Sequence, residues 1–579
     1  MPARRPSRLP LADALRLGRP PEIWFKPALS VVVSAGVPNL LLVALGRLDL
    51  AVYTMAGSLC ALYAHNRPYA ARARTLAGVV LGMTAGLAVS LVTASLTTDA
   101  AVLVAVGAAL AAVQKALCDA TRIGPPGHVI LTFVSSAALF APQRLDQVPA
   151  HLAPAVAAGV WAWAVCMAPG LLRPHGPERR ATAQALTEAA THAEAYGAAA
   201  TAGTPRTHDA THAPGAAASH AIRTADAGHA GRARAAAAVH AAWQALLATG
   251  ARTTRTRHAL GHLLVRAEVA LAAPADTDPE RLRAWARALR GTGPLPHVDD
   301  LPGEAAELHG TDIEQTLPVR PLHRRLATLA PVAARCFLGC ALAGWASLAL
   351  GFDRPYWALV TAASLYQANL TLTWSRSVQR VVGNLLGVLL FAAIVPLAHL
   401  HQALLVLFCL ALSFGAEALI GRNYWLGSVC VTPMALLITE FGRFQDSGEL
   451  ITERVLDTLV GALLGFAAAL AVTDRTAGAR LESALTAAER TREHTVRLLA
   501  APHTAPAALE HARRALAAAL VELRGTADAA AGEWWQRALP LDRVVLAEQA
   551  GHRTLAETVR RQGLTPAPRT DTQAEDVRP

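Results

Sequence analysis

Two long apolar blocks dominate this 579-residue chain, one near residues 27–172 and the other near residues 335–473. Polar sequence separates the blocks and follows the second one. Hydrophobic residues make up 53% of the chain and charged residues only 16%. Because this composition is too apolar for a soluble protein of this size, the chain is predicted to be an integral membrane protein in contact with the lipid bilayer.

Each block contains six apolar segments of helical length, and the second and fifth of each are short. A helix needs roughly 20 apolar residues to cross the hydrocarbon core, and fewer where it is enclosed in a bundle. We therefore predict an all-α polytopic protein with twelve spans. In the first block they lie near residues 27–46, 50–65, 75–97, 100–118, 127–142 and 152–172, and in the second near 335–351, 355–371, 378–398, 401–420, 424–441 and 454–473.

Basic residues are distributed unequally between the loops that this count creates. Short cytoplasmic loops carry an excess of Lys and Arg. With the N-terminus inside, the outside loops hold only Arg47, Arg144, Arg354, Arg443 and Arg454. Both termini are therefore predicted to be cytoplasmic, in a multi-pass protein of the cell membrane. No small-residue cleavage site follows the basic N-terminus, which favours a retained first span over a cleaved signal peptide.

The two blocks resemble each other, which predicts two six-helix halves. An even number of spans gives both copies the same orientation, a parallel repeat. The matching features are Leu62-Tyr63 with Leu365-Tyr366, Gly78 and Gly82 with Gly383 and Gly387, and Arg122 and Gly127 with Arg422 and Gly427. Small residues four apart let helix backbones approach closely, so these glycines, together with Gly461 and Gly465, are predicted to pack helices.

Ala-rich sequence with interspersed charges predicts a cytoplasmic helical region after each membrane block. The predicted helices lie near residues 178–198, 230–250, 253–273, 278–290, 478–500, 506–530 and 536–562. The predicted domains are a basic N-terminus at 1–26, the first membrane block at 27–173, a helical region with linkers at 174–330, the second membrane block at 335–473, a second helical region at 474–564 and a disordered tail at 565–579.

Several function classes find no support in the sequence. The net charge of +11 comes without a basic run interleaved with aromatic residues, which argues against nucleic-acid binding. The seven cysteines form no CxxC pair, and there is no P-loop, GxSxG or dinucleotide-binding motif. We therefore predict no enzyme activity, no cofactor and no metal. The histidine pairs His208 with His212 and His258 with His262 have a spacing that suits a metal, but a solvated helix face is the simpler interpretation.

Four stretches of the second block together resemble the fusaric acid resistance (FUSC) family, the aromatic acid exporter superfamily. They are "RPYWALVTAASLYQ", "SRSVQRVVGNLLGVLL", "GRNYWLGSVCVTPMALLI" and "ERVLDTLVGALLG". The motif residues are Tyr356, Trp357, Asn423, Tyr424, Thr432 and Pro433. The resemblance implies two membrane halves, each followed by a cytoplasmic helical region, and efflux of aromatic or other small organic acids.

An exporter of organic anions needs positive charge at its inner mouth. Arg376 and Arg380, in a predicted cytoplasmic turn, are candidates for this role, and the other candidates are Arg422, Arg122 and Lys115. The alternative is that these residues only fix topology and contact lipid headgroups. Glu417, within the fourth span of the second copy, is a candidate for carrying a coupling proton. The alternative is that Glu417 lies at the solvated end of this helix and has no such role.

These residues lead to a primary hypothesis of an efflux transporter for small organic acids, driven by the proton gradient. An anion channel of the same architecture needs the arginines but no titrating Glu417. A membrane scaffold acting through the cytoplasmic helical regions is the third alternative. Besides lipid and a small organic anion, the partners considered are a second copy of the chain and, if the host has an outer membrane, an adaptor protein.

Overall fold

The computed structural model describes residues 11–18, 23–202, 214–249, 254–298, 322, 325–326, 329–442, 444–472, 476–534 and 539–562. The predicted tail at 565–579, the pair His208 and His212, and Arg443 lie outside these residues. Throughout the described ranges the regular elements are helices, so the predicted all-α class is confirmed.

Among the described residues, eight helices are long and apolar enough to cross a membrane, and four apolar helices are shorter. The long ones are α2 (Phe25–Ala44), α4 (Tyr69–Leu96), α5 (Ala100–Thr121), α7 (Val148–Met167), α16 (Ala330–Ala349), α18 (Leu370–Ala398), α19 (Gln402–Ile420) and α21 (Ser447–Ala471). The short ones are α3 (Ala51–Ser58, with flanking 3-10 turns), α6 (Val129–Leu139), α17 (Tyr356–Leu365) and α20 (Tyr424–Thr439).

The short helices stand where the second and fifth span of each block were predicted. The order long, short, long, long, short, long therefore occurs twice along the chain. Ten residues of helix rise only about 15 Å, half of the hydrocarbon thickness, so α17 alone does not make a complete crossing. In the described part of the chain, eight of the twelve predicted spans thus coincide with helices long enough to cross a membrane and four with shorter apolar helices, and the parallel repeat stays a prediction.

Tyrosines end the second helix of each block. Tyr63 follows the 3-10 turn Leu59–Leu62 with extended backbone, and its hydroxyl donates to the Gly127 carbonyl at 2.7 Å. Tyr366 follows α17 in the same way and donates to the Gly465 carbonyl at 3.1 Å. Non-helical backbone is tolerated at membrane depth only where protein encloses it, and both tyrosines are buried.

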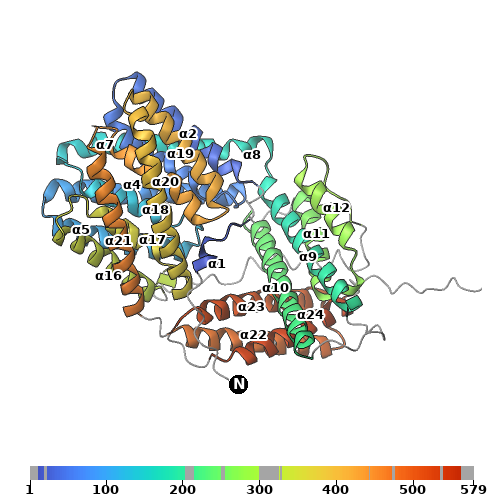
Figure 1. The fold of residues 1–579 in the computed structure, drawn as a ribbon. Coiled ribbons are helices and arrows are strands. Elements are labelled where there is room, and N and C mark those ends of the chain that lie inside the picture. The colour runs from blue at the N-terminus through green and yellow to red at the C-terminus, as the bar shows by residue number, and fades with distance from the viewer. Residues whose placement is uncertain are drawn as a thin grey trace, which may run out of the picture.

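The two blocks form one bundle rather than two separate bodies, as Figure 1 shows. Helix α16 packs on α5, α17 on α6, and α19 on α2. Aromatic rings hold the centre of this contact. Phe133 stacks on Trp357 with 5.7 Å between ring centroids, and Phe140 lies 5.8 Å from Tyr356.

The outer faces of the long helices carry apolar side chains. Leu81 on α4, Leu389 on α18 and Leu463 on α21 are each about two-thirds exposed or more, at 71%, 67% and 71%. Apolar surface of this extent is not stable against water, so these faces contact lipid.

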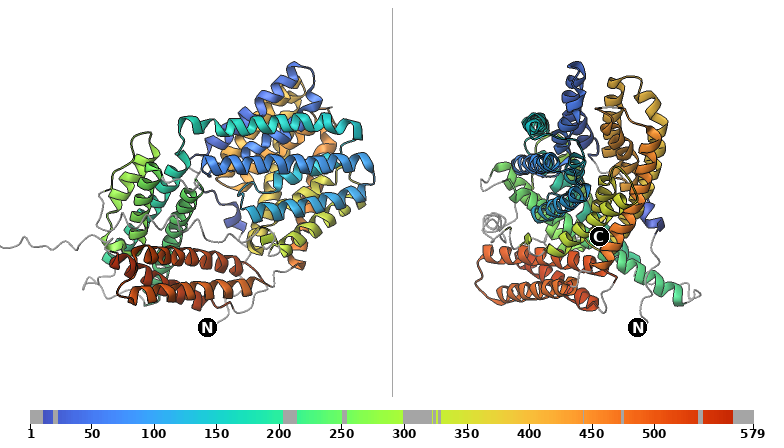
Figure 2. Two further views of the ribbon diagram at one scale, coloured as in Figure 1. Left: turned by 180° about the vertical axis from the view of Figure 1, so that it is seen from behind. Right: turned by 90° about the vertical axis from the view of Figure 1, so that its left-hand side faces the viewer.

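In the described ranges, seven helices of at least 12 residues lie outside the bundle, along two of its sides in Figures 1 and 2. We call them the extramembrane helices. They are α9 (Gly176–Ala202), α10 (Pro214–Leu247), α11 (Arg255–Ala272), α12 (Pro279–Arg290), α22 (Ala477–Ala500), α23 (Pro506–Ala531) and α24 (Leu541–Arg561). The two groups pack on each other through α10 with α23 and α11 with α24. The pair His258 and His262 does not form the expected solvated face, because His262 is buried.

We expect the extramembrane helices to lose stability in mild acid because of His192 on α9. The side chain is buried, and its Nε2 has no hydrogen-bond partner among the described residues. Burial, with the nearby Arg232 charge, lowers the pKa of His192 from 6.5 to about 4. The unfolded chain binds a proton below pH 6.5 while the folded chain does not, so stability is complete above pH 6.5 and falls as the pH drops towards 4.

The loss is on the order of 2 kcal/mol and should appear as faster hydrogen exchange of α9 at pH 5 than at pH 7.5, after correction for intrinsic rates. His192→Leu should remove this pH dependence. An unchanged dependence in the variant would assign the acid sensitivity to another group.

Candidate functional site

One face of α18 carries a column of polar side chains into the second membrane block. Arg376, Arg380 and Asn384 follow at intervals of four residues, which places them one above another on a helix. Arg380 and Asn384 are buried, with only 4% and 1% of their surface exposed. The predicted cytoplasmic turn at Arg376 and Arg380 is wrong, because α18 begins at Leu370 and includes both residues.

Helix α20 lies directly against this column because two glycines let it approach. A Cβ atom on Gly383 would stand 2.5 Å from the Cβ of Ser428, and one on Gly387 would stand 2.7 Å from that of Thr432. Such distances are below any normal contact, so a larger residue at either position would push α20 away. The geometry agrees with the predicted packing role of Gly383 and Gly387.

Tyr424, the first residue of α20, joins the two arginines of α18. The Arg376 guanidinium lies over the Tyr424 ring, 3.8 Å from its centroid. Arg380 donates from Nη1 to the Tyr424 hydroxyl at 3.3 Å. Tyr424 therefore links the charged groups of α18 to the start of α20.

Arg454 lies deeper in the same block. It was assigned to an outside loop, but α21 begins at Ser447, so Arg454 stands two turns inside the helix with 1% of its surface exposed. Its guanidinium covers the Trp357 ring at 4.0 Å from the centroid. It also donates from Nη2 to Oδ1 of Asn384 at 3.3 Å.

Asn384 connects three helices through its amide group. Its Oδ1 accepts hydrogen bonds from Thr432 on α20 and from Arg454 on α21, and its Nδ2 donates to Thr458 Oγ1 at 3.1 Å. The amide thus fixes the position along α18 at which the Arg454 side chain contacts that helix.

Asp457 completes the set one turn from Arg454. It is fully buried, and its Oδ1 accepts a hydrogen bond of 2.6 Å from Ser347 Oγ on α16. The other oxygen, Oδ2, has no partner among the described residues, and the same holds for Nε of Arg380 and for Nε and Nη1 of Arg454. We call the following residues the buried polar track: Arg376, Arg380, Asn384, Tyr424, Thr432, Arg454 and Asp457.

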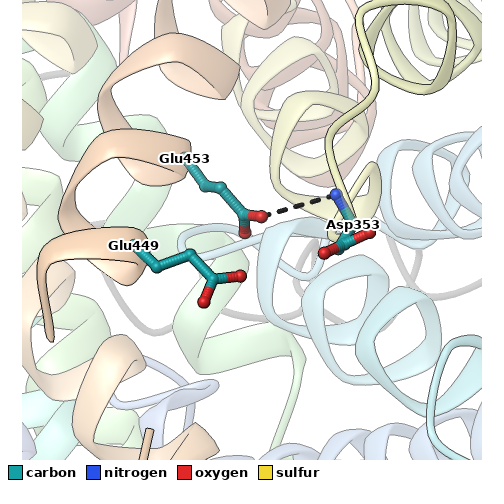
Figure 3. Close-up of side chains that lie close together, drawn as sticks. All are labelled: Asp353, Glu449 and Glu453. Atoms are coloured by element: carbon teal, nitrogen blue, oxygen red, sulfur yellow. Dashed lines mark hydrogen bonds between the residues drawn. The ribbon is translucent and has the colours of Figure 1, made fainter. Parts of the chain in front are cut away.

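A second group of charges lies where α21 begins. The carboxylates of Asp353, Glu449 and Glu453 gather within 4.8 Å of one another (Figure 3). The backbone amide of Asp353 donates to Glu453 at 3.4 Å. Arg354 forms ion pairs with both Glu453 and Glu449, the latter at 3.6 Å. Because this arginine already supplies cationic charge to two of the three acids, the cluster gives no support for a metal site.

The remaining candidates of the predicted anion path do not join the track. Lys115 on α5 is buried and pairs with Asp119 at 2.7 Å, so its charge is already compensated. Arg122 ends α5 in the left-handed conformation with an exposed side chain, and Arg422 is exposed as well. Glu417 on α19 is half-buried and makes no hydrogen bond or ion pair with the residues that the structure describes.

Two family-motif residues have structural roles beside the track. Asn423 caps α20 and donates to the carbonyls of Ala14 and Arg16 at 3.0 and 2.9 Å, which holds the N-terminal helix α1 (Leu11–Leu15) against the start of α20. Pro433 has no amide hydrogen, so the Val429 carbonyl one turn earlier loses its helical partner.

The other glycines that were predicted to pack helices differ in how closely a neighbouring helix approaches them. A Cβ on Gly461 would stand 2.8 Å from Thr361, and one on Gly465 would stand 3.0 Å from Ala362, so α21 packs tightly on α17. In the first block, by contrast, a Cβ on Gly78 would meet nothing within 4 Å and one on Gly82 only Leu131, at 3.8 Å. The packing role predicted for Gly78 and Gly82 is therefore wrong, because neither glycine lies at a close helix contact.

Neither Arg454 nor Asp457 was predicted as a site residue, although the predicted last span at 454–473 begins at Arg454 and includes Asp457. A signal for them does exist in the sequence. Glu453, Arg454 and Asp457 stand within one helical turn directly before a long apolar run, and α21 places Arg454 and Asp457 on its buried side.

Comparison with known proteins gives three findings. Residues 342–468 match the family described as fusaric acid resistance protein-like. The uncharacterized membrane protein YvaC of Bacillus subtilis is 26% identical over 506 residues, which cover 80% of this chain and 75% of that protein. An uncharacterized protein of Haemophilus influenzae is 31% identical over 151 residues, which cover 26% of this chain and 19% of that protein.

No solved structure was found to match the chain. The matched residues 342–468 run from α16 to α21 and include the whole buried polar track. The family relation suggests a membrane transporter or efflux protein. The chain is therefore an integral membrane protein whose residues 342–468 match the fusaric acid resistance protein-like family.

Proposed function

We propose that this protein exports small organic anions, aromatic carboxylates among them, along the buried polar track. The observation that carries the proposal is the charge of the track: Arg380 and Arg454 are buried guanidinium groups, and Asp457 is the carboxylate that accompanies them. Arginine keeps its charge in any protein environment. Excess positive charge in hydrocarbon is unfavourable, and an anion that enters the track lowers its energy.

The unpaired polar atoms support the same conclusion. Nε of Arg380 and Nε and Nη1 of Arg454 are buried donors without a hydrogen-bond partner in the described part of the chain. Buried donors are nearly always satisfied, and a guanidinium presents its donors in a fork that fits a carboxylate. The two arginines thus offer the donors that a carboxylate ligand accepts.

The rings beside the arginines favour an aromatic body on the ligand. Tyr424 contacts Arg376 and Arg380, and Trp357 lies under Arg454. An aromatic acid that moves from one arginine to the next would find a ring surface near each of them, with the stacking preferences that aromatic pairs show.

Proton coupling is assigned here to Asp457 rather than to Glu417. Asp457 is an acid of the track, one turn from Arg454. Protonating Asp457 would leave Arg454 without a counter-charge and strengthen its hold on the anion, while deprotonation would weaken it. Glu417 makes no contact with the described arginines through which its proton would act.

Transport by purified protein in liposomes tests the proposal. With a pH gradient imposed, radiolabelled benzoate should accumulate above the level in protein-free liposomes, which corrects for passage of the neutral acid. Arg380→Gln should lower this rate about tenfold or more, because it removes a charge-assisted contact along the path. The matched control is Arg422→Gln, an exposed arginine that should leave the rate unchanged.

Two results would contradict the proposal. Wild-type protein that moves no aromatic or aliphatic carboxylate under any gradient would remove the transport function and favour a scaffold. Equal losses in Arg380→Gln and Arg422→Gln would mean that arginines act on the whole fold or its orientation and not at a path.

A further inference from the structure

A cavity of about 940 Å³ lies between the two groups of extramembrane helices. It is lined by α10 and α11 from the region after the first membrane block, and by α23 and α24 from the region after the second. A cavity of this size accepts a ligand of the size of a drug molecule. None of its lining residues belongs to the buried polar track.

More positive than negative side chains line the cavity. Five arginines face it, and three carboxylates accompany them: Arg232, Arg234, Arg513, Arg514 and Arg524, with Glu268, Asp528 and Glu548. Three of the arginines have acidic partners. Arg513 pairs with Glu268 at 2.9 Å, Arg524 with Glu548 at 3.3 Å, and Arg514 with Glu510 behind the wall.

Arg232 and Arg234 are the cations that remain. Neither forms an ion pair with a carboxylate in the described part of the chain, and Nε of Arg232 is buried without a hydrogen-bond partner. The Nδ1 atom of His511, on the opposite wall, is buried without a partner as well. A buried arginine donor without a partner, such as Nε of Arg232, is a group that an anionic ligand in the cavity would satisfy.

The rest of the lining is apolar or aromatic. Val239, Leu247, Leu520 and Leu555 contribute side chains from three helices. Trp243 is held in place by a hydrogen bond to Glu268 at 2.8 Å and by the Arg514 guanidinium, 3.9 Å from its ring centroid. Apolar walls with a few polar groups are typical of sites for organic ligands.

We propose that this cavity is a regulatory site for an amphipathic organic anion, an aromatic carboxylate whose charged head meets Arg232 and whose rings lie against the apolar walls. The inference does not rest on the proposed transport path, because the cavity and the track share no residue. A ligand bound here would join helices from the two regions that the second membrane block separates.

Helix α23 connects the cavity to the transport block. Its residues from Arg513 to Asp528 line the cavity, and the chain just after its end contacts the start of α18. The Gly532 carbonyl accepts from the backbone amide of Thr371 at 3.1 Å, and Trp534 Nε1 donates to Thr371 Oγ1 at 3.1 Å. Glu533 lies 3.6 Å from Arg335 of α16. Occupancy of the cavity can therefore bias the position of α18, which carries Arg376 and Arg380.

Calorimetric titration of the full-length protein in detergent with 1-naphthoate tests this site. The wild type should bind it, and 1-naphthalenemethanol, which has the same rings without the charge, should bind at least tenfold more weakly. Arg232→Gln should weaken 1-naphthoate binding about tenfold, because one charge-assisted hydrogen bond is lost. Arg234→Gln, at an exposed position, should give a smaller loss and keeps the test valid if the first variant folds poorly.

Two further variants separate this site from the transport path. Arg490→Gln replaces an exposed arginine of α22 that does not line the cavity, and it should leave binding unchanged. Arg380→Gln should retain the binding that Arg232→Gln loses. Ligand should also slow hydrogen exchange in α10 and α23 of the wild type.

The inference is overturned if the wild type does not bind 1-naphthoate. It is also overturned if Arg232→Gln and Arg234→Gln both bind 1-naphthoate with the wild-type affinity. Binding that disappears only in Arg380→Gln would likewise overturn it and assign the ligand to the transport path alone. In that case the proposed transport function would still stand.

Discussion

Arg454→Gln is expected to lower anion transport about a hundredfold, with the protein still inserted in the membrane. Arg454 has 1% of its surface exposed and contacts Trp357 and Asn384, while its Nε and Nη1 have no partner among the described residues. The variant loses two charge-assisted hydrogen bonds to the moving anion, at about 1.5 to 3 kcal/mol each. Two bonds at the lower value together contribute about 3 kcal/mol, which corresponds to roughly a hundredfold change in rate.

Initial rates of labelled benzoate uptake in liposomes measure this effect. Arg144→Gln is the matched control, because Arg144 is an exposed loop arginine whose ion pair with Asp146 is also exposed. Arg454→Lys keeps the charge but loses the planar fork and should recover only part of the rate. If Arg454→Gln folds and transports at the wild-type rate, the anion does not pass this residue.

Asp457→Asn should abolish accumulation driven by the pH gradient while downhill exchange of the anion continues. Asn keeps an oxygen that accepts the hydrogen bond from Ser347, now made at 2.6 Å to Asp457, but it carries no titrating proton. Arg454 would then keep the same electrostatic environment at every pH, and the proton gradient could no longer alter its affinity for the anion.

Glu417→Gln is the matched control for this prediction, since it makes the same chemical change at an acid that the structure does not join to the track. Counterflow and gradient-driven uptake are measured for both variants. Loss of uphill transport in Glu417→Gln alone would return the coupling role to Glu417. Uphill transport that survives in both would mean that neither acid couples the proton, and purely downhill flux in the wild type would describe a channel.

The extramembrane helices are connected to the membrane block that carries the buried polar track. The end of α23 is bonded to the first turn of α18 through Thr371 and Gly532, so a change in their packing reaches the helix with the arginines. The expected acid sensitivity at His192 and the proposed ligand site at Arg232 lie on neighbouring helices, because the Arg232 charge contributes to lowering the pKa of His192. An anion bound at Arg232 would therefore also be expected to raise the pKa of His192.

Much of the architecture could be predicted from residues alone, because membrane helices are long, apolar and local in sequence. The all-α class, the two apolar blocks and the short second and fifth segments were all predicted. The motif residues around Tyr356 and Asn423 were sufficient to indicate the family. An added Cβ would stand close to the neighbouring helix at Gly383 and Gly461 and would meet nothing within 4 Å at Gly78.

The site itself depended on tertiary structure. Hydropathy treats a charged residue as the end of a span, so Arg380 was assigned to a turn and Arg454 to a loop. Both are inside helices because side chains far away in sequence make burial possible: Tyr424 and Asn384 accept their hydrogen bonds, and Trp357 offers its ring. The sequence by itself determined which segments enter the membrane, since that depends on local apolarity. Which charges enter with them was decided only by the packing of α16, α17, α18, α20 and α21, because a buried charge is stable only with partners that the fold brings together.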